Sequence, residues 1–135
     1  MNILQEYSKE LMEHFTHPRN IGEIKNPDGV GEVGNPRCGD VMKLYIKVGK
    51  RKKGKINEEF IEDIKVQTLG CGAAIASSSM ATELIKGKSL TKAKELTNEA
   101  VAKALGGLPP QKVHCSILAR QGIHNAIEDY ESKKH

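Results

Sequence analysis

Alternating apolar and polar residues predict two β-strands in the first half of the chain. Over residues 41–48, apolar side chains fall on one face at every second position: Met42, Leu44, Ile46 and Val48. The opposite face is expected to carry the intervening residues: Lys43, Tyr45 and Lys47. Residues 60–68 repeat this period of two, which is typical of a half-buried strand. The basic run at residues 49–55 is predicted to be the turn of an antiparallel hairpin, and a solvated tip is favoured over a docking patch.

Apolar residues at helical spacing predict helices over most of the remaining chain. The expected helices cover four stretches: residues 3–15, 73–86, 89–105 (one or two short helices) and 115–131. Glycine and proline punctuate residues 17–37, which predicts a long loop with one short strand around residues 31–34. The prolines of Leu108-Pro109-Pro110 predict an extended segment before the last helix.

These elements predict one α+β domain over residues 1–135: a small antiparallel sheet of about three strands covered by helices. A chain of 135 residues that is 38% hydrophobic and 28% charged has the composition of a folded domain. The first residues form no apolar run of signal-peptide length and carry Glu6, Glu10 and Glu13. We therefore expect a cytoplasmic protein without a membrane partner.

The charge and the aromatic content argue against nucleic acid as a partner. A net charge of +4 is mild, and the chain has no Trp, two Phe and three Tyr with which to stack bases. The three cysteines are widely spaced and odd in number, which is not the pattern of a disulfide framework. The cysteines are therefore expected as free thiols in a reducing compartment.

All three cysteines lie at the ends of predicted elements. Cys38 precedes the first predicted strand and Cys71 follows the second, and these two ends of an antiparallel hairpin lie side by side. Asp40, two residues after Cys38, is expected to face the same side. Cys71 and Cys115 open predicted helices, and a helix N-terminus lowers the pKa of a thiol. The sequence thus predicts reactive or ligating cysteines rather than core cysteines.

The residues around the cysteines would supply three sulfur ligands and two candidates for a fourth ligand. The predicted set is Cys38, Asp40, Cys71, His114 and Cys115. Such a four-coordinate set suits either zinc or an iron–sulfur cluster, and spacing without a Cys-x-x-Cys pair leaves both open. His14 and His17, at the end of the first predicted helix, are expected to have capping or surface roles.

A cysteine-based enzyme is a third interpretation, because His114 beside Cys115 resembles a nucleophile–base pair. Adjacent residues at a helix start usually point apart, however, and no orienting acid follows His114 in the sequence. The sequence therefore predicts a binding protein and not an enzyme.

Three segments closely resemble the cysteine signatures of the IscU/NifU-type iron–sulfur cluster assembly scaffolds: Gly34–Leu44, Gly70–Ser79 and Lys112–Ala119. Four shorter segments are also similar to that family: Tyr7-Ser8, His17–Asn20, Lys86–Leu90 and Leu108–Pro110. The resemblance covers nearly the whole chain. It implies a non-catalytic platform that accepts iron and sulfur, builds a [2Fe-2S] cluster and hands it to apo-proteins.

The resemblance also implies a role for individual residues. Four residues match the cluster ligands of the family: Cys38, Asp40, Cys71 and Cys115. His114 matches an alternative ligand that also takes part in zinc binding, and Cys115 matches the thiol that accepts persulfide sulfur. Lys112 matches a basic residue beside the site, and Tyr7 matches an aromatic residue linked to self-association and persulfide reduction.

The partners implied by the resemblance are a cysteine desulfurase or another sulfur source, apo iron–sulfur acceptor proteins, a ferredoxin and a second copy of the chain. Gln111 replaces an apolar residue of the family's chaperone-recognition segment, here Leu108–Lys112, which disfavours recognition by a dedicated Hsp70 chaperone. The alternative function is a structural zinc domain with a Cys₃Asp or Cys₃His site, and zinc is a candidate metal for the isolated protein.

Overall fold

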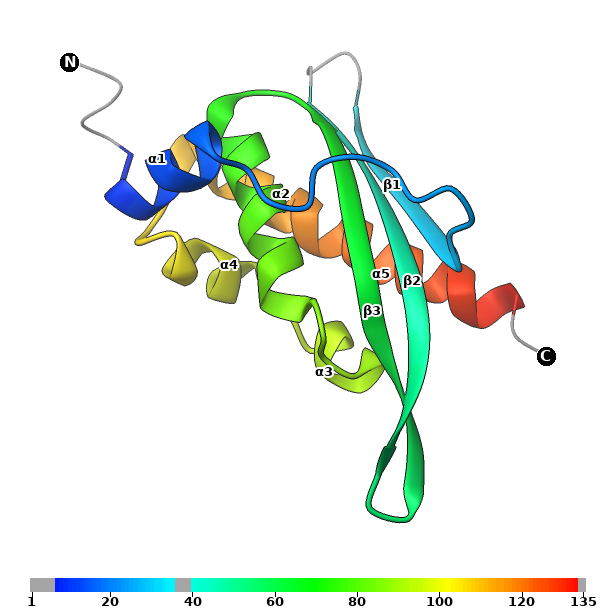
Figure 1. Cartoon of the computed structure of the whole chain (residues 1–135). Helices are drawn as coiled ribbons and strands as arrows, with labels where there is room; N and C mark the ends of the chain where they lie inside the picture. The colour runs from blue at the N-terminus through cyan, green and yellow to red at the C-terminus, as the bar shows by residue number, and fades with distance from the viewer. Residues whose placement is uncertain (1–6, 36–39, 134–135) are drawn as a thin grey trace.

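The fold is a three-stranded antiparallel sheet with helices packed on one face, as the computed structural model shows for residues 7–35 and 40–133 (Figure 1). The strands are β1 (Gly29–Asn35), β2 (Asp40–Lys53) and β3 (Ile56–Leu69). The helices are α1 (Lys9–Thr16), α2 (Gly72–Ile85), α3 (Leu90–Lys94), α4 (Asn98–Ala104), the 3₁₀ helix η2 (Pro110–Lys112) and α5 (Val113–Lys133). The predicted α+β fold is confirmed. Within the described ranges, no helix is long and apolar enough to cross a membrane.

The core lies between the inner face of the sheet and helices α2 and α5. Strand β2 is central, with β1 and β3 antiparallel on either side. The predicted inward residues Met42, Leu44 and Ile46 are fully buried. Helix α5 runs across β1 and β2, while α2 packs against β3 (Figure 1). The backbones of β1 and α5 approach so closely that a Cβ at Gly31 would collide with the carbonyl of Gly122, so side-chain-free positions set the distance between these two layers.

The first helix begins later than the pattern predicts. Ser8 is its N-cap: the backbone there is extended, and the hydroxyl accepts a hydrogen bond from the backbone N–H of Leu11 at 2.9 Å. A capping serine satisfies a helix-terminal donor only from outside the helix. Tyr7 therefore precedes α1, and the predicted helical residues 3–6 lie outside the described ranges.

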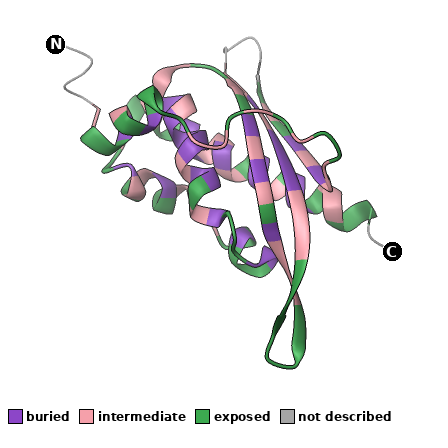
Figure 2. Ribbon diagram, viewed as in Figure 1, coloured by how far each residue is buried: buried purple, intermediate pink, exposed green. Residues whose placement is uncertain are grey.

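The basic run at residues 49–55 is mostly strand rather than turn. Strands β2 and β3 continue to Lys53 and from Ile56, so the turn is limited to Gly54 and Lys55. Gly54 has φ +66°, the left-handed conformation that a tight hairpin turn requires. Both faces of this extension are solvated, so it has no apolar alternation from which strands could be predicted (Figure 2).

Tyr45 is buried, although the alternation places it on the outer face of the sheet. The loop at residues 17–28 crosses that face from the free edge of β3 to the start of β1 (Figure 1). At the β3 edge, the backbone N–H of Val66 donates to the carbonyl of Asn20 at 2.8 Å. The Tyr45 hydroxyl donates to Oε1 of Gln67 at 2.8 Å. The outer face is thus covered by the loop, which strand periodicity cannot predict.

The segment before the last helix is only partly extended. Pro109 is non-helical, but Pro110 begins η2, which runs directly into α5 at Val113. Proline has a φ that fits the first position of a helix, so the second proline starts a helical turn instead of prolonging the extended segment. The short helices α3 and α4, and the end of α2 before Gly87, agree with the prediction.

His14 is buried, which differs from the expected capping or surface role. Its Nδ1 lies 2.8 Å from Oγ of Ser79, and the same Oγ accepts the backbone N–H of Arg19 at 2.8 Å. Burial lowers the pKa of His14 below the ordinary 6.5, and the positive charge of Arg19 lowers it further. Glu83 and Glu13 oppose this shift. The fold therefore favours neutral His14.

Because the pKa of His14 is lower in the folded protein than in the unfolded chain, this residue destabilises the fold on acidification. Its favourable contribution is present above about pH 6.5 and is lost as the pH falls below that value. We expect the free energy of unfolding in urea to decrease between pH 7.5 and 5.5, and to decrease less in His14→Gln. His17→Gln is the control, since the His17 side chain is 75% exposed. An equal pH dependence in wild type and His14→Gln would contradict this role.

Candidate metal centre

Four of the predicted site residues meet where three elements end. Asp40 begins β2, Cys71 joins β3 to α2, and His114 and Cys115 lie in the first turn of α5. The ladder explains the first pair: Val41 is opposite Leu69, so the start of β2 and the end of β3 share one edge. The predicted proximity of Asp40 and Cys71 follows from this register. Cys38 lies outside the described residues.

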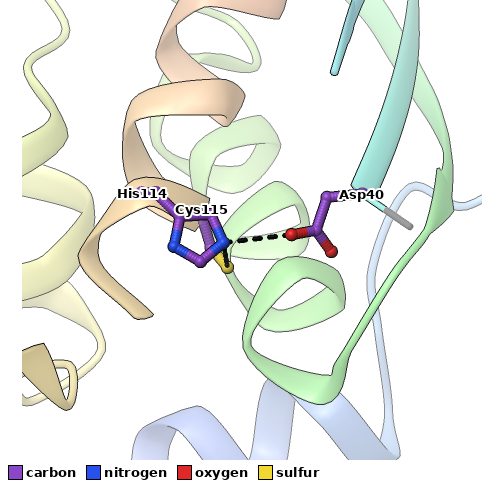
Figure 3. Close-up of side chains that lie close together, drawn as sticks. All are labelled: Asp40, His114 and Cys115. Carbon is purple, nitrogen blue, oxygen red and sulfur yellow. Dashed lines mark hydrogen bonds and ion pairs between the residues drawn. The ribbon is translucent and has the colours of Figure 1, made fainter. Parts of the chain in front are cut away.

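The candidate ligand atoms are within one coordination sphere of one another (Figure 3). Nε2 of His114 lies 3.0 Å from Oδ2 of Asp40 and 3.6 Å from Sγ of Cys115. These oxygen, nitrogen and sulfur atoms are all within 4.8 Å of each other. Sγ of Cys71 is 3.9 Å from Sγ of Cys115. A thiol, an imidazole and a carboxylate therefore face one point with a second thiol beside them, which is the ligand chemistry of zinc and of iron–sulfur clusters.

Local backbone features make room for this cluster. Cys71 is the N-cap of α2, and its carbonyl accepts the N–H groups of Ala74 and Ile75 at 3.0 and 3.1 Å. Its thiol makes no capping hydrogen bond and stays available to a ligand. A Cβ at Gly70 would lie 2.5 Å from Oδ1 of Asp40, so only glycine leaves space for that carboxylate.

Lys112 lies near both described thiols and near Tyr7. The negative charge of Cys71 raises the pKa of Lys112 above its ordinary value, and Tyr7 and Cys115 add to this effect. Lys112 is the last residue of η2, directly before the turn of α5 that carries the candidate ligands. Tyr7 is half-buried and packs against the core. The arrangement gives the two thiols a nearby cation.

The expectation that a helix N-terminus lowers the pKa of Cys115 is wrong. The pKa of this thiol is raised to about 12, chiefly by burial, and then by the negative charge of Cys71, a hydrogen bond to Cys71 and the charge of Asp40. Lys112 opposes the shift. Because α5 begins at Val113, Cys115 is the third residue of the helix and is fully buried. Desolvation of the thiolate outweighs the favourable helix dipole and the nearby cation.

The structure also corrects the expectation that His114 and Cys115 point apart without an acid nearby. The His114 ring and the Cys115 thiol are in contact with each other, and Asp40 is an acid in contact with the same ring. A nucleophile–base–acid relay, however, uses both ring nitrogens of the histidine, one for the nucleophile and one for the acid. Here Asp40 and Cys115 both contact Nε2. Convergence on one nitrogen suits a shared metal position better than a relay.

The site has an apolar rim that was not predicted from the sequence. Leu69 is 68% exposed directly before Gly70 and Cys71, and the ring of Phe15 lies 3.3 Å from the position of a Cβ at Gly72. Phe15 and Val113 are also exposed. The signal for Leu69 was present in the sequence, because this apolar residue is out of phase with the buried alternate positions of β3.

The two described thiols differ in exposure, which predicts their relative reactivity. Cys71 is partly exposed, whereas Cys115 is fully buried and must wait for local opening. We expect iodoacetamide to label Cys71 about tenfold faster or more in the metal-free protein, which corresponds to about 1.4 kcal/mol of opening free energy. Peptide mapping by mass spectrometry measures both rates, and labelling in urea is the control in which the difference disappears. Faster labelling of Cys115 in the folded protein would contradict the geometry.

Comparison with known proteins identifies close relatives. Residues 6–135 match the family model described as NifU-like N terminal domain. The chain is 55% identical over 127 residues to "Iron-sulfur cluster assembly scaffold protein IscU 1" of Archaeoglobus fulgidus, which covers 94% of this chain and 78% of the relative. It is 50% identical over 131 residues to "Iron-sulfur cluster assembly scaffold protein IscU" of Escherichia coli strain K12, covering 95% and 96%.

A solved structure shows the same fold at lower sequence identity. The N-terminal part of a nitrogen-fixing NifU-like protein from Brucella abortus superposes with a TM-score of 0.67 at 20% identity, covering 98% of this chain and 99% of that one. The family match extends over nearly the whole chain and includes all the described candidate ligands. The chain belongs to the NifU-like N-terminal domain family, together with the IscU proteins.

Proposed function

We propose that this protein is a scaffold on which a [2Fe-2S] cluster is assembled from iron and sulfur and then transferred to apo-proteins. The observation that carries the proposal is the convergence of Asp40, Cys71, His114 and Cys115 at one edge of the sheet. The relatives named as iron–sulfur cluster assembly scaffolds support the same function. The cluster is the cargo of the protein, and the protein itself catalyses no reaction.

The proposed ligands are Cys38, Cys71 and Cys115 with Asp40, and His114 competes with Asp40 for the fourth position. Three thiolates hold the iron firmly, while a harder oxygen ligand holds it less well. The 3.0 Å contact between Asp40 and His114 supports exchange, because one side chain can replace the other without a large movement. His114 is also the more mobile candidate, since its side chain is 51% exposed against 14% for Asp40.

Cys115 is the proposed sulfur acceptor, with a cysteine desulfurase as the donor. The Cys115 thiolate attacks the outer sulfur of the donor persulfide, and the donor cysteine leaves as a thiolate. Conversion of the accepted sulfur to sulfide needs two electrons, for which a ferredoxin is the proposed source. Cys115 is buried and its pKa is raised in the closed arrangement, so the donor must open the site first. Lys112 and Tyr7 are proposed to assist this step beside the thiols.

Other proposed properties follow from the same function. Free thiols and an oxygen-sensitive cargo suit the reducing cytoplasm. Acceptors of the cluster are apo iron–sulfur proteins, and a second copy of the chain is a proposed partner during assembly. Gln111 is exposed on η2, so it changes the surface of the segment that a chaperone would contact. We therefore propose no dedicated Hsp70 partner.

A structural zinc site is the alternative, and the structure gives it less support. A zinc ion that maintains a fold is normally enclosed and replaces a missing core. Here the core is extensive without the site, and His114 is half-exposed at its edge. Zinc in the isolated protein would instead mark the position that the iron of the cluster takes.

Metal and acid-labile sulfide analysis of anaerobically purified protein tests the proposed function. We expect equal amounts of iron and sulfide after purification or after reconstitution with both. Zinc that cannot be exchanged for iron and sulfide would instead support the structural zinc site. If the protein takes up neither metal nor sulfide under reconstitution, both interpretations are overturned.

A further inference from the structure

A basic groove lies at the end of the molecule opposite to the metal centre. The β2–β3 hairpin extends beyond the helices, and its extension is exposed (Figures 1 and 2). Between the base of this hairpin and the connection from α2 to α3 is a groove of about 470 Å³. The lining contains four cations, Arg51, Lys53, Lys88 and Lys92, and a single acid, Glu58.

The charge in this groove is only partly neutralised. Glu58 accepts from Nε of Arg51 at 2.8 Å and lies 4.0 Å from Nζ of Lys53, so its carboxylate is shared between two cations. Lys92 pairs with Glu95 at 3.8 Å, but both side chains are mostly exposed, and such pairs are weak. Lys88 has no ion pair with any residue in the described ranges. An excess of positive charge therefore remains along the groove.

The groove also has an apolar floor and fixed walls. Leu84 and Leu96 contribute half-buried side chains to it. Its two sides are joined by backbone hydrogen bonds: the N–H of Ile61 donates to the carbonyl of Lys88, and the N–H of Gly87 donates to the carbonyl of Ile61, both at 2.8 Å. A preformed groove binds a ligand with less loss of conformational entropy than a flexible one.

We propose that this groove binds a short acidic segment of a partner protein. Its carboxylates would contact Lys88, Lys92 and the free side of Arg51, and one apolar side chain would pack on Leu84 and Leu96. The charge of the lining is complementary to such a segment. A phosphate backbone would also match the charge but has no apolar group to pack on Leu84 and Leu96. Among the described residues, the groove lining contains no aromatic ring for base stacking, and the guanidinium of Arg51 covers one face of the nearby Phe60 at 4.4 Å.

A partner bound in this groove leaves the metal centre accessible. Helix α2 has 14 residues and runs from Gly72, next to Cys71, to Ile85 in the lining of the groove, which at about 1.5 Å per residue separates the two sites by about 20 Å. The hairpin is therefore a second docking point, at which one protein can be held while another reaches the thiols. The exposed lysines at the tip, Lys50, Lys52 and Lys55, extend the positive charge toward such a partner.

The test uses the complete metal-free chain, so its outcome is independent of cluster assembly. The probe is a synthetic peptide of glutamate and aspartate residues with one central leucine, titrated into nitrogen-labelled protein and followed by amide NMR shifts. We expect saturable shifts centred on residues 84–96 and 51–58, and affinity that falls with added salt. The peptide with glutamine and asparagine in place of the acids should not bind, and the peptide without leucine should bind more weakly.

Matched variants locate the binding. The double variant Lys88→Gln with Lys92→Gln should lower the affinity for the peptide about tenfold. Lys25→Gln with Lys103→Gln removes the same charge from exposed positions outside the groove and should change the affinity little. Equal loss in both double variants, shifts centred elsewhere, or no binding would overturn the proposal. Tighter binding of a single-stranded oligonucleotide than of the acidic peptide would overturn it too, since it would make the groove a nucleic-acid site.

Discussion

Cys71→Ser should lower the yield of [2Fe-2S] cluster in anaerobic reconstitution by at least about tenfold. The thiol of Cys71 lies 3.9 Å from that of Cys115 and makes no capping bond, which supports its proposed role as a ligand. A serine hydroxyl is a harder and more basic donor that binds an iron–sulfur core poorly. Visible absorption together with iron and sulfide analysis measures the yield. We expect the same result for Cys115→Ser, and for Cys38→Ser if all three thiols are ligands.

The control for this experiment is Ser116→Ala. Ser116 is buried next to Cys115, and its hydroxyl donates to the carbonyl of Val113 rather than toward the site. Ser116→Ala should keep the wild-type cluster yield. Thermal unfolding should show that Cys71→Ser and Cys115→Ser remain folded. A wild-type cluster yield in folded Cys71→Ser would remove Cys71 from the ligand set.

Asp40→Ala should lengthen the lifetime of the cluster and slow its transfer to an apo-ferredoxin by about tenfold. Loss of the carboxylate leaves the fourth position to His114, whose Nε2 is already 3.0 Å from the oxygen that is removed. Nitrogen is a softer donor than carboxylate oxygen and holds the iron longer. Circular dichroism of the ferredoxin during the reaction follows the transfer rate.

A structural role of Asp40 predicts a different outcome. If the carboxylate mainly stabilises the turn before β2, the metal-free variant should unfold at a lower temperature, and cluster loss should follow unfolding. Glu62→Ala, at an exposed position of β3, controls for the loss of one negative charge. Unchanged transfer in normally folded Asp40→Ala would refute ligand exchange and leave His114 as the fourth ligand to test.

The elements that carry a strong periodic pattern were predictable from the sequence. The buried halves of β2 and β3, helix α2 and most of α5 follow from apolar spacing alone. The proximity of Asp40 and Cys71 follows from the antiparallel register of those strands. The approach of His114 and Cys115 to the same edge depends on how α5 packs across the sheet. Periodicity does not specify that packing, and family resemblance supplied it.

The corrections at Tyr45, His14 and Cys115 share one physical cause, which is the influence of distant parts of the chain. Tyr45 is buried by a loop that returns across the outer face, and His14 is buried against Ser79, 65 residues away. Cys115 was expected to ionise easily at a helix start, but tertiary burial determines its pKa. The strands of the hairpin extension have polar residues on both faces, so the usual alternation is missing there.

The transfer of a labelled cluster tests the central claim most directly. The protein is reconstituted with radioactive iron and sulfide, freed of excess reagents, and mixed with an apo-ferredoxin in the presence of an iron chelator. We predict that both labels move to the ferredoxin in equal proportion and faster than iron moves to the chelator. Labels that remain with the chain, or iron that reaches the ferredoxin only by way of the chelator and without sulfide, would contradict a scaffold function.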